Sequence, residues 1–283
     1  MSMEGVVIKK NANLFSVEDS TTKKVVKLQA SGKTQESGIF VGDRVFYSDV
    51  IEKVFDRKNI LIRPPLANLD KLFIVLAPLP KPDFVLVDKL IVYCFIKGVQ
   101  PILVVNKIDK AHETFVKNIK KIYNKIAKCL FVSAKSNQID RLSNQIEGIC
   151  AFAGQSAVGK SSLINCLFSQ QIAQVGNVSK KIERGKQTTR MVQLFPYSKG
   201  YIADTAGFSM LDLSFVTDLE PRELSAYYPD FLSARAECKY RSCLHEAGSD
   251  CGVIKAIEKN QISQERYQNY LKILRELKDR KKY

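Results

Sequence analysis

Residues 154–161 have the sequence Gly-Gln-Ser-Ala-Val-Gly-Lys-Ser, in which two glycines frame a short loop that ends in a lysine and a hydroxyl residue. Backbone N–H groups of such a loop can point at phosphate oxygens, and glycine lets the backbone approach them closely. Lys160 would bring a positive charge to the β- and γ-phosphates, and the Ser161 hydroxyl could coordinate Mg²⁺. A helix that begins near Gly159 would direct its positive end at the same phosphates. The motif predicts nucleoside triphosphate binding but leaves ATP and GTP open. The residues expected to contact the nucleotide here are Gly154, Gln155, Ser156, Ala157, Val158, Gly159, Lys160, Ser161 and Ser162.

A second motif, Asn106-Lys107-Ile108-Asp109, follows the apolar run 101–105 and indicates the base. The Asp109 carboxylate can accept two hydrogen bonds from the ring and exocyclic N–H groups of guanine, a donor pair that adenine lacks. The Lys107 stem can lie over the base, and Asn106 can tie neighbouring loops together. Alone, the motif could equally be a polar turn after a strand. A third motif also follows a short apolar run, and the three together favour a guanine nucleotide. The residues of this third motif are Ser133, Ala134 and Lys135.

A fourth motif, Asp204-Thr205-Ala206-Gly207, follows the apolar run 200–203. Asp204 is placed to hold Mg²⁺, and the Gly207 N–H can meet the γ-phosphate and move when that phosphate leaves. In an ordinary GTPase the phosphate loop comes first and the base-recognition motifs come last. Here the base-recognition motifs precede the loop, so the order of parts is rotated along the chain.

Catalysis has to be assigned without the usual glutamine, because Phe208 directly follows the fourth motif and has no group that could orient water. The nearest substitute is Gln187, in the segment 185–190 between the phosphate loop and the fourth motif. A threonine of this segment can coordinate Mg²⁺ in the GTP state, and the pattern leaves Thr188 and Thr189 both open. The alternative for the segment is a basic surface loop. The expected catalytic residues are Lys160, Gln187, Thr189 and Gly207, and the expected magnesium ligands are Ser161, Thr189 and Asp204.

Four soft metal ligands lie within fourteen residues of one another near the end of the chain: Cys238, Cys243, His245 and Cys251. A set of three cysteines and one histidine is typical of a structural, tetrahedral zinc site. The chain has only two histidines, and one of them falls inside this cluster. The alternative is three buried or redox-active cysteines beside a surface histidine. We expect one structural zinc ion per chain, and magnesium to bind together with GTP.

Composition limits the class of protein. The chain has 283 residues, 45% of them hydrophobic, which is enough for packed cores in one to three domains. No apolar stretch reaches the roughly 18 residues that a membrane span needs. An odd number of cysteines, seven, argues against a disulfide framework and favours a reducing cytoplasm. The net charge of +15 indicates a polyanionic partner, although a lysine-rich solvated surface would produce the same charge.

Three domains are expected to position these motifs. Residues 1–66 contain five short apolar runs that predict an all-β OB-fold barrel with RNA contact, although a barrel that only packs on its neighbour is the alternative. The five runs are 5–8, 14–17, 24–28, 44–47 and 59–62, and residues 63–65 are predicted to be a linker.

Residues 67–212 alternate strands and helices, which predicts a largely parallel sheet with helices on both faces. One helix is predicted over 84–97 and ends at Gly98. Residues 213–283 hold the cysteine cluster and then a predicted helix from Ile254 to Tyr283. That helix carries nine Lys or Arg against four Asp or Glu, so RNA contact and a solvated amphipathic face are both open.

With these motifs in place, the whole chain resembles the family of circularly permuted, ribosome small-subunit-dependent GTPase A proteins. The resemblance implies an OB-fold barrel and a helical zinc domain that flank the GTPase and grip the small ribosomal subunit and its rRNA. It also implies a monomeric, cytoplasmic enzyme that hydrolyses GTP to GDP during late maturation of that particle. Besides the motifs above, the resemblance rests on residues 57–59, 63–65, 68–70, 154–165, 185–190 and 194–196.

The chain departs from that family at three places. Gln187 stands where the family usually has a histidine proposed to help catalysis, Ala206 replaces a proline, and residues 248–250 lack the usual proline before the last cysteine. A different translation GTPase and an RNA-binding scaffold that uses nucleotide only structurally are the competing functions.

Overall fold

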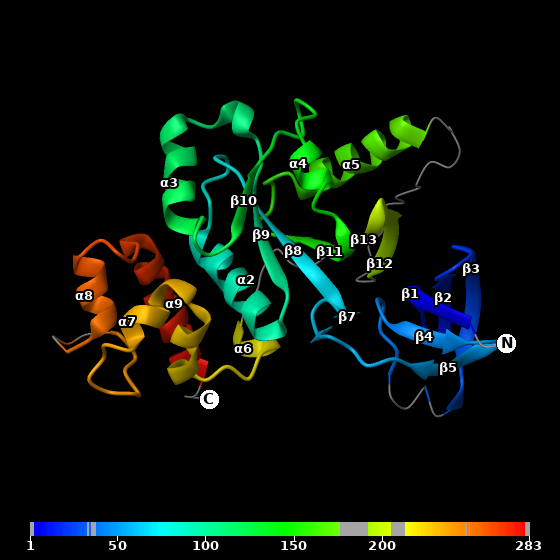
Figure 1. The fold of residues 1–283 in the computed structure, drawn as a ribbon, viewed down its shortest axis with the longest axis horizontal. Helices are drawn as coiled ribbons and strands as arrows, with labels where there is room; N and C mark the ends of the chain where they lie inside the picture. The colour runs from blue at the N-terminus through cyan, green and yellow to red at the C-terminus, as the bar shows by residue number, and fades with distance from the viewer. Residues whose placement is uncertain are drawn as a thin grey trace.

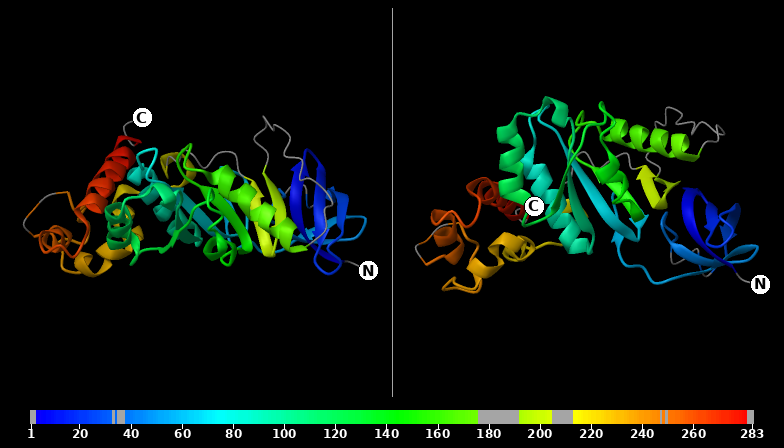
Figure 2. Two further views of the ribbon diagram at one scale, coloured as in Figure 1. Left: turned by 90° about the horizontal axis from the view of Figure 1, so that it is seen from above. Right: turned by 45° about the horizontal axis from the view of Figure 1, so that its top comes forward.

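The computed structural model describes residues 3–32, 34, 38–175, 192–204, 213–246, 248 and 250–280. The chain forms three units in a row, with the N-terminal barrel at one end and the C-terminal helices at the other (Figures 1 and 2). The predicted multi-domain architecture is confirmed: a β-barrel, a central α/β unit and a helical C-terminal unit that carries the Cys/His cluster. Within the described ranges, no helix is both long and apolar enough to cross a bilayer.

The N-terminal barrel closes because its first strand pairs with two others, β2 and β4. The strand order is β1-β2-β3-β5-β4 and back to β1, and only the β3–β5 pairing is parallel. Apolar side chains that alternate along the strands, such as Val7, Phe15 and Val45, fill the interior. This is the topology expected of an OB-fold. The strands are β1 (Met3–Asn11), β2 (Leu14–Asp19), β3 (Val25–Ala30), β4 (Arg44–Tyr47) and β5 (Val50–Val54).

The prediction of the fifth barrel strand was wrong. The fifth strand is β5 (Val50–Val54), where Ile51 alone is buried and Glu52 and Lys53 face solvent. The run 59–62, predicted for that place, instead forms β6 (Ile60–Leu61), which pairs with β7 (Leu66–Ala67) in a separate hairpin. Residues 63–65 are therefore the tip of a hairpin and not an open linker.

The central unit is built on a sheet of the order β10-β9-β8-β11-β13-β12. The first five of these strands are parallel, and β12 runs antiparallel to β13. The interior strands are almost continuously apolar, because helices cover both faces. The strands are β8 (Leu69–Leu76), β9 (Gln100–Val105), β10 (Lys128–Phe131), β11 (Glu147–Ala153), β12 (Gln193–Tyr197) and β13 (Lys199–Asp204).

Two apolar cores lie on the two faces of this sheet. One contains Leu86 and Leu90 of α2 (Phe84–Lys97) and Ile119 of α3 (Glu113–Tyr123). The other contains Leu142 of α4 (Asp140–Ser143) and Leu163 of α5 (Lys160–Val175). The predicted bounds of α2 are confirmed: Asp83 caps its first turn, and Gly98 ends it in the left-handed conformation at φ 64°.

The C-terminal unit differs from its prediction in one respect. Two helices, α8 (Gly252–Glu258) and α9 (Gln264–Arg280), replace the single helix predicted from Ile254. The break includes Asn260, which adopts a left-handed conformation at φ 55°. The remaining elements of this unit are α6 (Leu213–Val216), η2 (Pro221–Tyr227), η3 (Pro229–Phe231) and α7 (Leu232–Arg235).

Candidate nucleotide and metal sites

The polar motifs converge at one edge of the central sheet. The phosphate loop connects β11 to α5, the Asn106 motif follows β9, Ser133 lies just beyond β10, and Asp204 ends β13. Since these strands are parallel, their carboxyl ends lie at the same edge, where nucleotide sites of open α/β sheets are found. The helix α5 begins at Lys160, so its N-terminus opens onto the loop.

Glycine is required at both ends of the phosphate loop. Gly154 has φ 128°, and a Cβ there would lie 2.2 Å from the Val75 carbonyl oxygen. Gly159 has φ 97°, and a Cβ there would lie 2.4 Å from Asn106 Nδ2. Both residues have a backbone conformation that side chains disfavour, and neither has room for a side chain. The loop therefore packs directly on β8 and on the Asn106 motif.

Asn106 joins three of the motifs and is almost completely buried. Its Nδ2 donates to the Val158 carbonyl at 3.0 Å, in the phosphate loop. Its Oδ1 accepts from the Ala134 N–H at 3.2 Å, in the third motif. The predicted tie between loops thus has a definite geometry, and both polar atoms of the Asn106 side chain take part in it.

The side chains of Lys107 and Asp109 are arranged around the expected base position. Lys107 Nζ donates to the Leu79 carbonyl at 2.9 Å and to the Ala157 carbonyl at 2.7 Å, so its stem crosses from the base motif to the phosphate loop. Ser133 Oγ donates to Asp109 Oδ1 at 2.6 Å. That hydrogen bond is the main cause of the lowered pKa of Asp109, which keeps the carboxylate ionised and able to accept from a base.

Lys160 folds back over its own loop. Its Nζ donates to the carbonyls of Gly154 at 2.6 Å and Gln155 at 2.8 Å. Partial burial lowers the pKa of Lys160 below its ordinary value. Phosphate oxygens are stronger acceptors than these carbonyls, so the same ammonium group suits a polyphosphate placed in the loop.

Two of the three expected magnesium ligands lie on adjacent parallel strands or just beyond them. Ser161 is in the first turn of α5, after β11, and Asp204 is the last residue of β13, which pairs with β11. Hydroxyl and carboxylate oxygens are the ligands that Mg²⁺ prefers. The expected ligand Thr189 lies outside the described residues, as do Gln187, Thr188 and Gly207.

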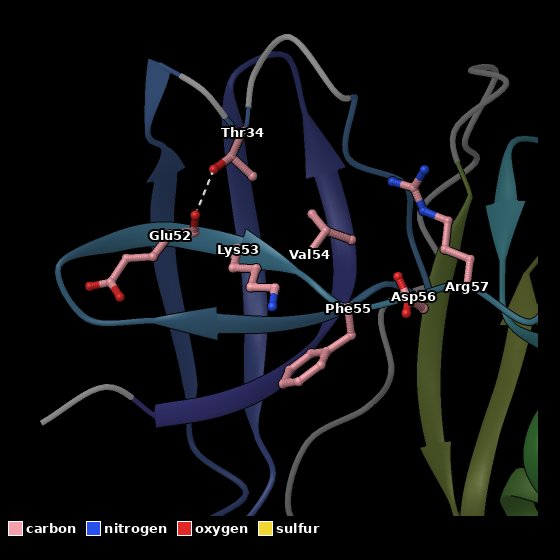
Figure 3. Close-up of a pocket in the computed structure, with 7 residues that line it drawn as sticks. All are labelled: Thr34, Glu52, Lys53, Val54, Phe55, Asp56 and Arg57. Carbon is pink, nitrogen blue, oxygen red and sulfur yellow. Dashed lines mark hydrogen bonds between the residues drawn. The ribbon is translucent and has the colours of Figure 1, made fainter.

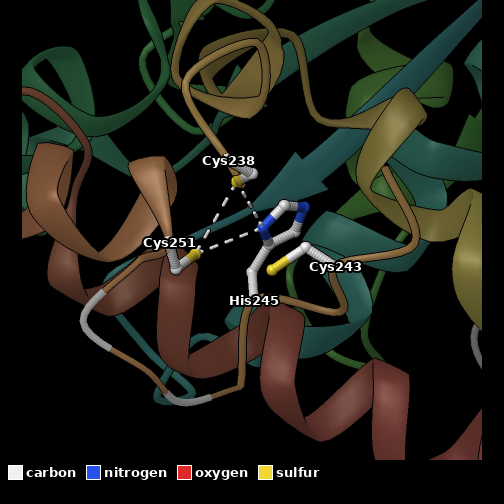
Figure 4. Close-up of side chains that lie close together, drawn as sticks. All are labelled: Cys238, Cys243, His245 and Cys251. Carbon is white, nitrogen blue, oxygen red and sulfur yellow. Dashed lines mark hydrogen bonds between the residues drawn. The ribbon is translucent and has the colours of Figure 1, made fainter. Parts of the chain in front are cut away.

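The four predicted metal ligands are brought together, with their ligand atoms all within 4.8 Å of one another (Figure 4). His245 Nδ1 lies 3.6 Å from Cys238 Sγ and 3.4 Å from Cys251 Sγ, and the two sulfur atoms are 3.9 Å apart. Tetrahedral coordination at about 2.3 Å to sulfur and about 2.0 Å to nitrogen would separate neighbouring ligands by roughly 3.5–3.8 Å. The donor set and its spacing therefore fit a zinc ion.

The surroundings of His245 favour the form that binds metal. Burial, together with the positive charge of Arg235, lowers the pKa of His245 to about 4, so the imidazole is neutral near pH 7. Tyr267 donates from its hydroxyl to the His245 carbonyl at 2.8 Å, and Tyr270 donates to the Leu244 carbonyl at 2.9 Å. These bonds from α9 fix the loop that carries the histidine.

The barrel carries a groove of about 380 Å³ between β5 and the β3–β4 connection (Figure 3). Its charged lining is mixed: Lys53 and Arg57 are basic, Glu52 and Asp56 are acidic, and Phe55 adds an aromatic ring. Arg57 is paired with the buried Asp43 at 2.7 Å. The Arg44 guanidinium lies 5.1 Å from the centre of the Phe55 ring. Cationic and aromatic side chains in a groove are the usual means of contacting single-stranded nucleic acid.

The sequence did not predict that the loop after β8 contacts both the base-recognition motif and the phosphate loop. The Leu79 carbonyl accepts from Lys107, and the Asp83 N–H donates to Gln155 Oε1 at 3.2 Å. The only available signal was Asp83 in front of a helical pattern, which indicates a helix cap and says nothing about a contact with the phosphate loop. The burial of Arg266, which pairs with Asp88 and Asp230, was also not predicted, because a charged residue in a polar helix is normally exposed.

A parallel sheet with the phosphate loop and base-recognition motifs at one edge, in rotated chain order, defines a circularly permuted P-loop GTPase. The family model described as RsgA GTPase matches residues 54–214, and the model described as 50S ribosome-binding GTPase matches residues 149–280. The chain belongs to the RsgA GTPase family and is a GTP hydrolase.

Relatives and solved structures resemble the chain over nearly its full length. The small ribosomal subunit biogenesis GTPase RsgA of Thermotoga neapolitana is 36% identical over 98% of both chains. The protein of Listeria monocytogenes named RsgA 2 is also 36% identical, over 99% of both chains. The crystal structure of YjeQ from Thermotoga maritima has a TM-score of 0.84 at 32% identity and covers 98% of this chain and 99% of its own. YloQ, described as a circularly permuted GTPase, has a TM-score of 0.83 at 29% identity and covers 99% of this chain and 96% of its own.

Proposed function

We propose that this GTPase binds the small ribosomal subunit and uses GTP hydrolysis in late maturation of that particle. The observation that carries the proposal is the full-length likeness to proteins named for small-subunit biogenesis. The net charge of +15 supports a partner rich in RNA, and Lys53 and Phe55 of the barrel groove are side chains of the kinds that contact nucleic acid. Three units, 1–66, 67–212 and 213–283, divide the work into RNA contact, GTP hydrolysis and attachment through the zinc-bearing helices.

In the nucleotide pocket, Asp109 accepts the guanine N–H groups, Lys107 lies over the base, and Asn106 holds the loops in register. The loop residues and Lys160 hold the phosphates, assisted by the N-terminus of α5. A magnesium ion would be held by Ser161, Asp204 and Thr189, and would neutralise charge on the β- and γ-phosphates. The position of Ser161 in the first turn of α5, after β11, and of Asp204 at the end of the neighbouring strand β13 supports this assignment.

Catalysis is assigned to Lys160, Gln187, Thr189 and Gly207. Gln187 orients the attacking water, since Phe208 cannot. Docking on the small subunit would place the Gln187 amide against that water and accelerate hydrolysis. Gln187→Ala should therefore keep GTP binding and lose most of the stimulated rate. A fully stimulated Gln187→Ala enzyme would show that another group positions the water.

One zinc ion, held by Cys238, Cys243, His245 and Cys251, stabilises the fold of the C-terminal unit and takes no part in hydrolysis. The neutral, buried imidazole and the short distances between ligand atoms support this role. The protein acts as a monomer, and its odd number of cysteines, seven, supports a location in the reducing cytoplasm.

Sedimentation with isolated small subunits tests the proposed function. The protein should pellet with small subunits when a non-hydrolysable GTP analogue is present and much less with GDP. Equal binding in both nucleotide states would favour a scaffold that uses nucleotide structurally. Failure to bind small subunits, with retained binding to assembled ribosomes, would favour a different translation GTPase.

A further inference from the structure

A buried ionic cluster joins the C-terminal unit to the nucleotide-binding unit. Arg266 of α9 is 1% exposed and lies between two carboxylates, Asp88 of α2 and Asp230 of η3. Its Nη1 donates to Asp88 Oδ1 at 2.5 Å, while Nε and Nη2 donate to the two Asp230 oxygens at 2.9 and 3.0 Å. A single guanidinium thus connects one carboxylate from each unit.

The same cluster holds the first turn of α2. Asn269 of α9 donates through Nδ2 to Asp88 Oδ2 at 2.8 Å and to the carbonyl of Phe84, the first residue of α2, at 3.3 Å. The Arg266 guanidinium also lies 5.6 Å from the ring centre of Tyr123, the last residue of α3. The two helices of the nucleotide-binding unit that follow the loops after β8 and β9 therefore both meet α9 at this point.

The first turn of α2 is also bonded to the phosphate loop. Asp83 caps the helix by accepting from the Leu86 N–H at 3.0 Å, and its own N–H donates to Gln155 Oε1 at 3.2 Å. A continuous set of contacts runs from Arg266 through Asp88 and the capped turn to Gln155. Asp88 and Phe84, the two α2 residues that α9 contacts, lie about one helical turn apart, so the contact with α9 and the bond to Gln155 act on the same end of the helix.

Stability alone does not require an ionic cluster at this position. Buried ionic groups can often be replaced by apolar side chains at little cost in stability, and their attested advantage is to fix one arrangement of packed elements. Burial raises the pKa of Asp88 to about 6 despite the opposing effect of Arg266, so this carboxylate depends on its partners to remain charged. Tyr228 lies against the guanidinium, with its ring centre 4.6 Å away, and excludes water from the cluster.

We propose that Arg266 is a positioning residue for nucleotide binding, which holds the first turn of α2, and through it Gln155 of the phosphate loop, in register with the C-terminal unit. A partner that shifts α9 would thereby change the rate at which nucleotide leaves. The inference rests on the proposed use of the pocket by guanine nucleotides and is independent of which particle the protein binds.

The dissociation rate of mant-GDP, a fluorescent GDP derivative, measures this effect in the full-length protein. Arg266→Met should speed release by about tenfold, within the range of about 5- to 150-fold typical of coupling between sites. Arg266→Lys keeps the positive charge but lacks the planar guanidinium that bonds both carboxylates. Its mant-GDP release should therefore be slower than that of Arg266→Met but faster than that of the parent. The matched control is Glu276→Gln, which removes the neighbouring α2–α9 pair between Lys89 and Glu276 and leaves the cluster intact. Its release should stay within about twofold of the parent, since the Glu276 side chain is 48% exposed and an ion pair with a solvated partner contributes little.

The route through Gln155 is tested by a double-mutant cycle. In the Gln155→Ala background, Arg266→Met should add little to the release rate, whereas full additivity would overturn the proposed route. Release from folded Arg266→Met within twofold of the parent would overturn the proposal itself.

If Arg266→Met does not fold, a triple variant tests the same proposal. The combination Asp88→Leu, Asp230→Leu and Arg266→Met replaces the cluster by apolar groups, and it should fold yet release mant-GDP faster than the parent. Parent-like release would then contradict the proposal. Binding of mant-GDP by the parent separately establishes that the pocket takes guanine nucleotide.

Discussion

The nucleotide-binding unit is joined to the barrel and to the C-terminal unit by different means. The barrel joint combines backbone pairing with side-chain hydrogen bonds. β1 pairs with β12 at Lys9 and Gln193, and the Ala67 N–H donates to the Val41 carbonyl at 2.9 Å. Asn68 Nδ2 also donates to the Gly42 carbonyl at 2.9 Å. The C-terminal joint depends on side chains, above all Arg266 with Asp88. Backbone hydrogen bonds survive most substitutions, but a side-chain cluster can be lost through one.

The two joints also meet different parts of the nucleotide-binding unit. The barrel lies against β12 and β13, and the second of these ends at Asp204. The C-terminal unit lies against α2 and α3, which follow the loops after β8 and β9. The barrel therefore contacts the strand that ends at Asp204, and the C-terminal unit contacts the helix whose capping residue, Asp83, is bonded to Gln155.

Loss of a metal ligand should have the largest effect. Cys251→Ser removes one ligand of the Cys/His cluster, and structural zinc contributes about 10–16 kcal/mol in small metal-folded units. The C-terminal unit should unfold, while guanine nucleotide should still bind with about tenfold faster release, as expected for Arg266→Met. Zinc content by elemental analysis and protection of the C-terminal unit in hydrogen exchange check this. Parent protein that contains no zinc, although it was purified without chelators, would contradict the assignment.

Removing the charge from the side-chain joint should rank second. Arg266→Met leaves the buried Asp88 and the partly buried Asp230 without their cation, and breaking a buried pair typically costs about 3–5 kcal/mol. Unfolding in urea, followed at the C-terminal unit, measures this. A loss below about 1 kcal/mol would mean that the cluster is not a determinant of this joint.

Removing one bond from the barrel joint should cost less. Tyr201 donates from its hydroxyl to Glu18 Oε1 at 2.7 Å, and Glu18 is 5% exposed. Tyr201→Phe should lower the free energy of unfolding by about 1–3 kcal/mol, because a buried acceptor loses its donor. The pairing of β1 with β12 should persist in hydrogen exchange. Detachment of the barrel from this single change would show that the remaining backbone and side-chain bonds cannot hold the joint.

The smallest expected effect is a pH dependence confined to the barrel. Asp19 accepts hydrogen bonds from the Thr22 N–H, the Tyr47 hydroxyl and the Thr22 hydroxyl, which lower its pKa to about 2. A carboxylate with a lowered folded-state pKa stabilises the fold above its unfolded value near 4 and loses that contribution as the pH falls to about 2. Asp19→Asn should reduce proton uptake on unfolding by up to about one proton in this window. An unchanged slope of stability against pH between 2 and 4 would refute the role of Asp19.

The sequence predicted the parts of the fold that local chemistry determines. The bounds of α2 followed from Asp83 and Gly98, and the strands at the pocket followed from apolar runs that end in polar motifs. The fifth barrel strand failed because the runs 50–54 and 59–62 are both short and partly polar, so their partners, and not their residues, decide which joins the barrel.

The candidate site was predictable to a similar degree. The tie between loops through Asn106 and the assembly of the Cys/His cluster follow from motif spacing. The burial of Arg266 and the bond between Asp83 and Gln155 arise from tertiary packing over long sequence separations, which no local pattern encodes.

GTP hydrolysis with and without isolated small ribosomal subunits tests the central claim most directly. Small subunits should raise the hydrolysis rate of the parent by at least about tenfold. The upper bound is the gain of about 10³–10⁵ seen when a GTPase site is completed by a missing catalytic group. Lys160→Ala should remain inactive in both conditions, which excludes a contaminating GTPase. A parent rate that small subunits leave unchanged, or that large subunits raise equally, would contradict the proposed function.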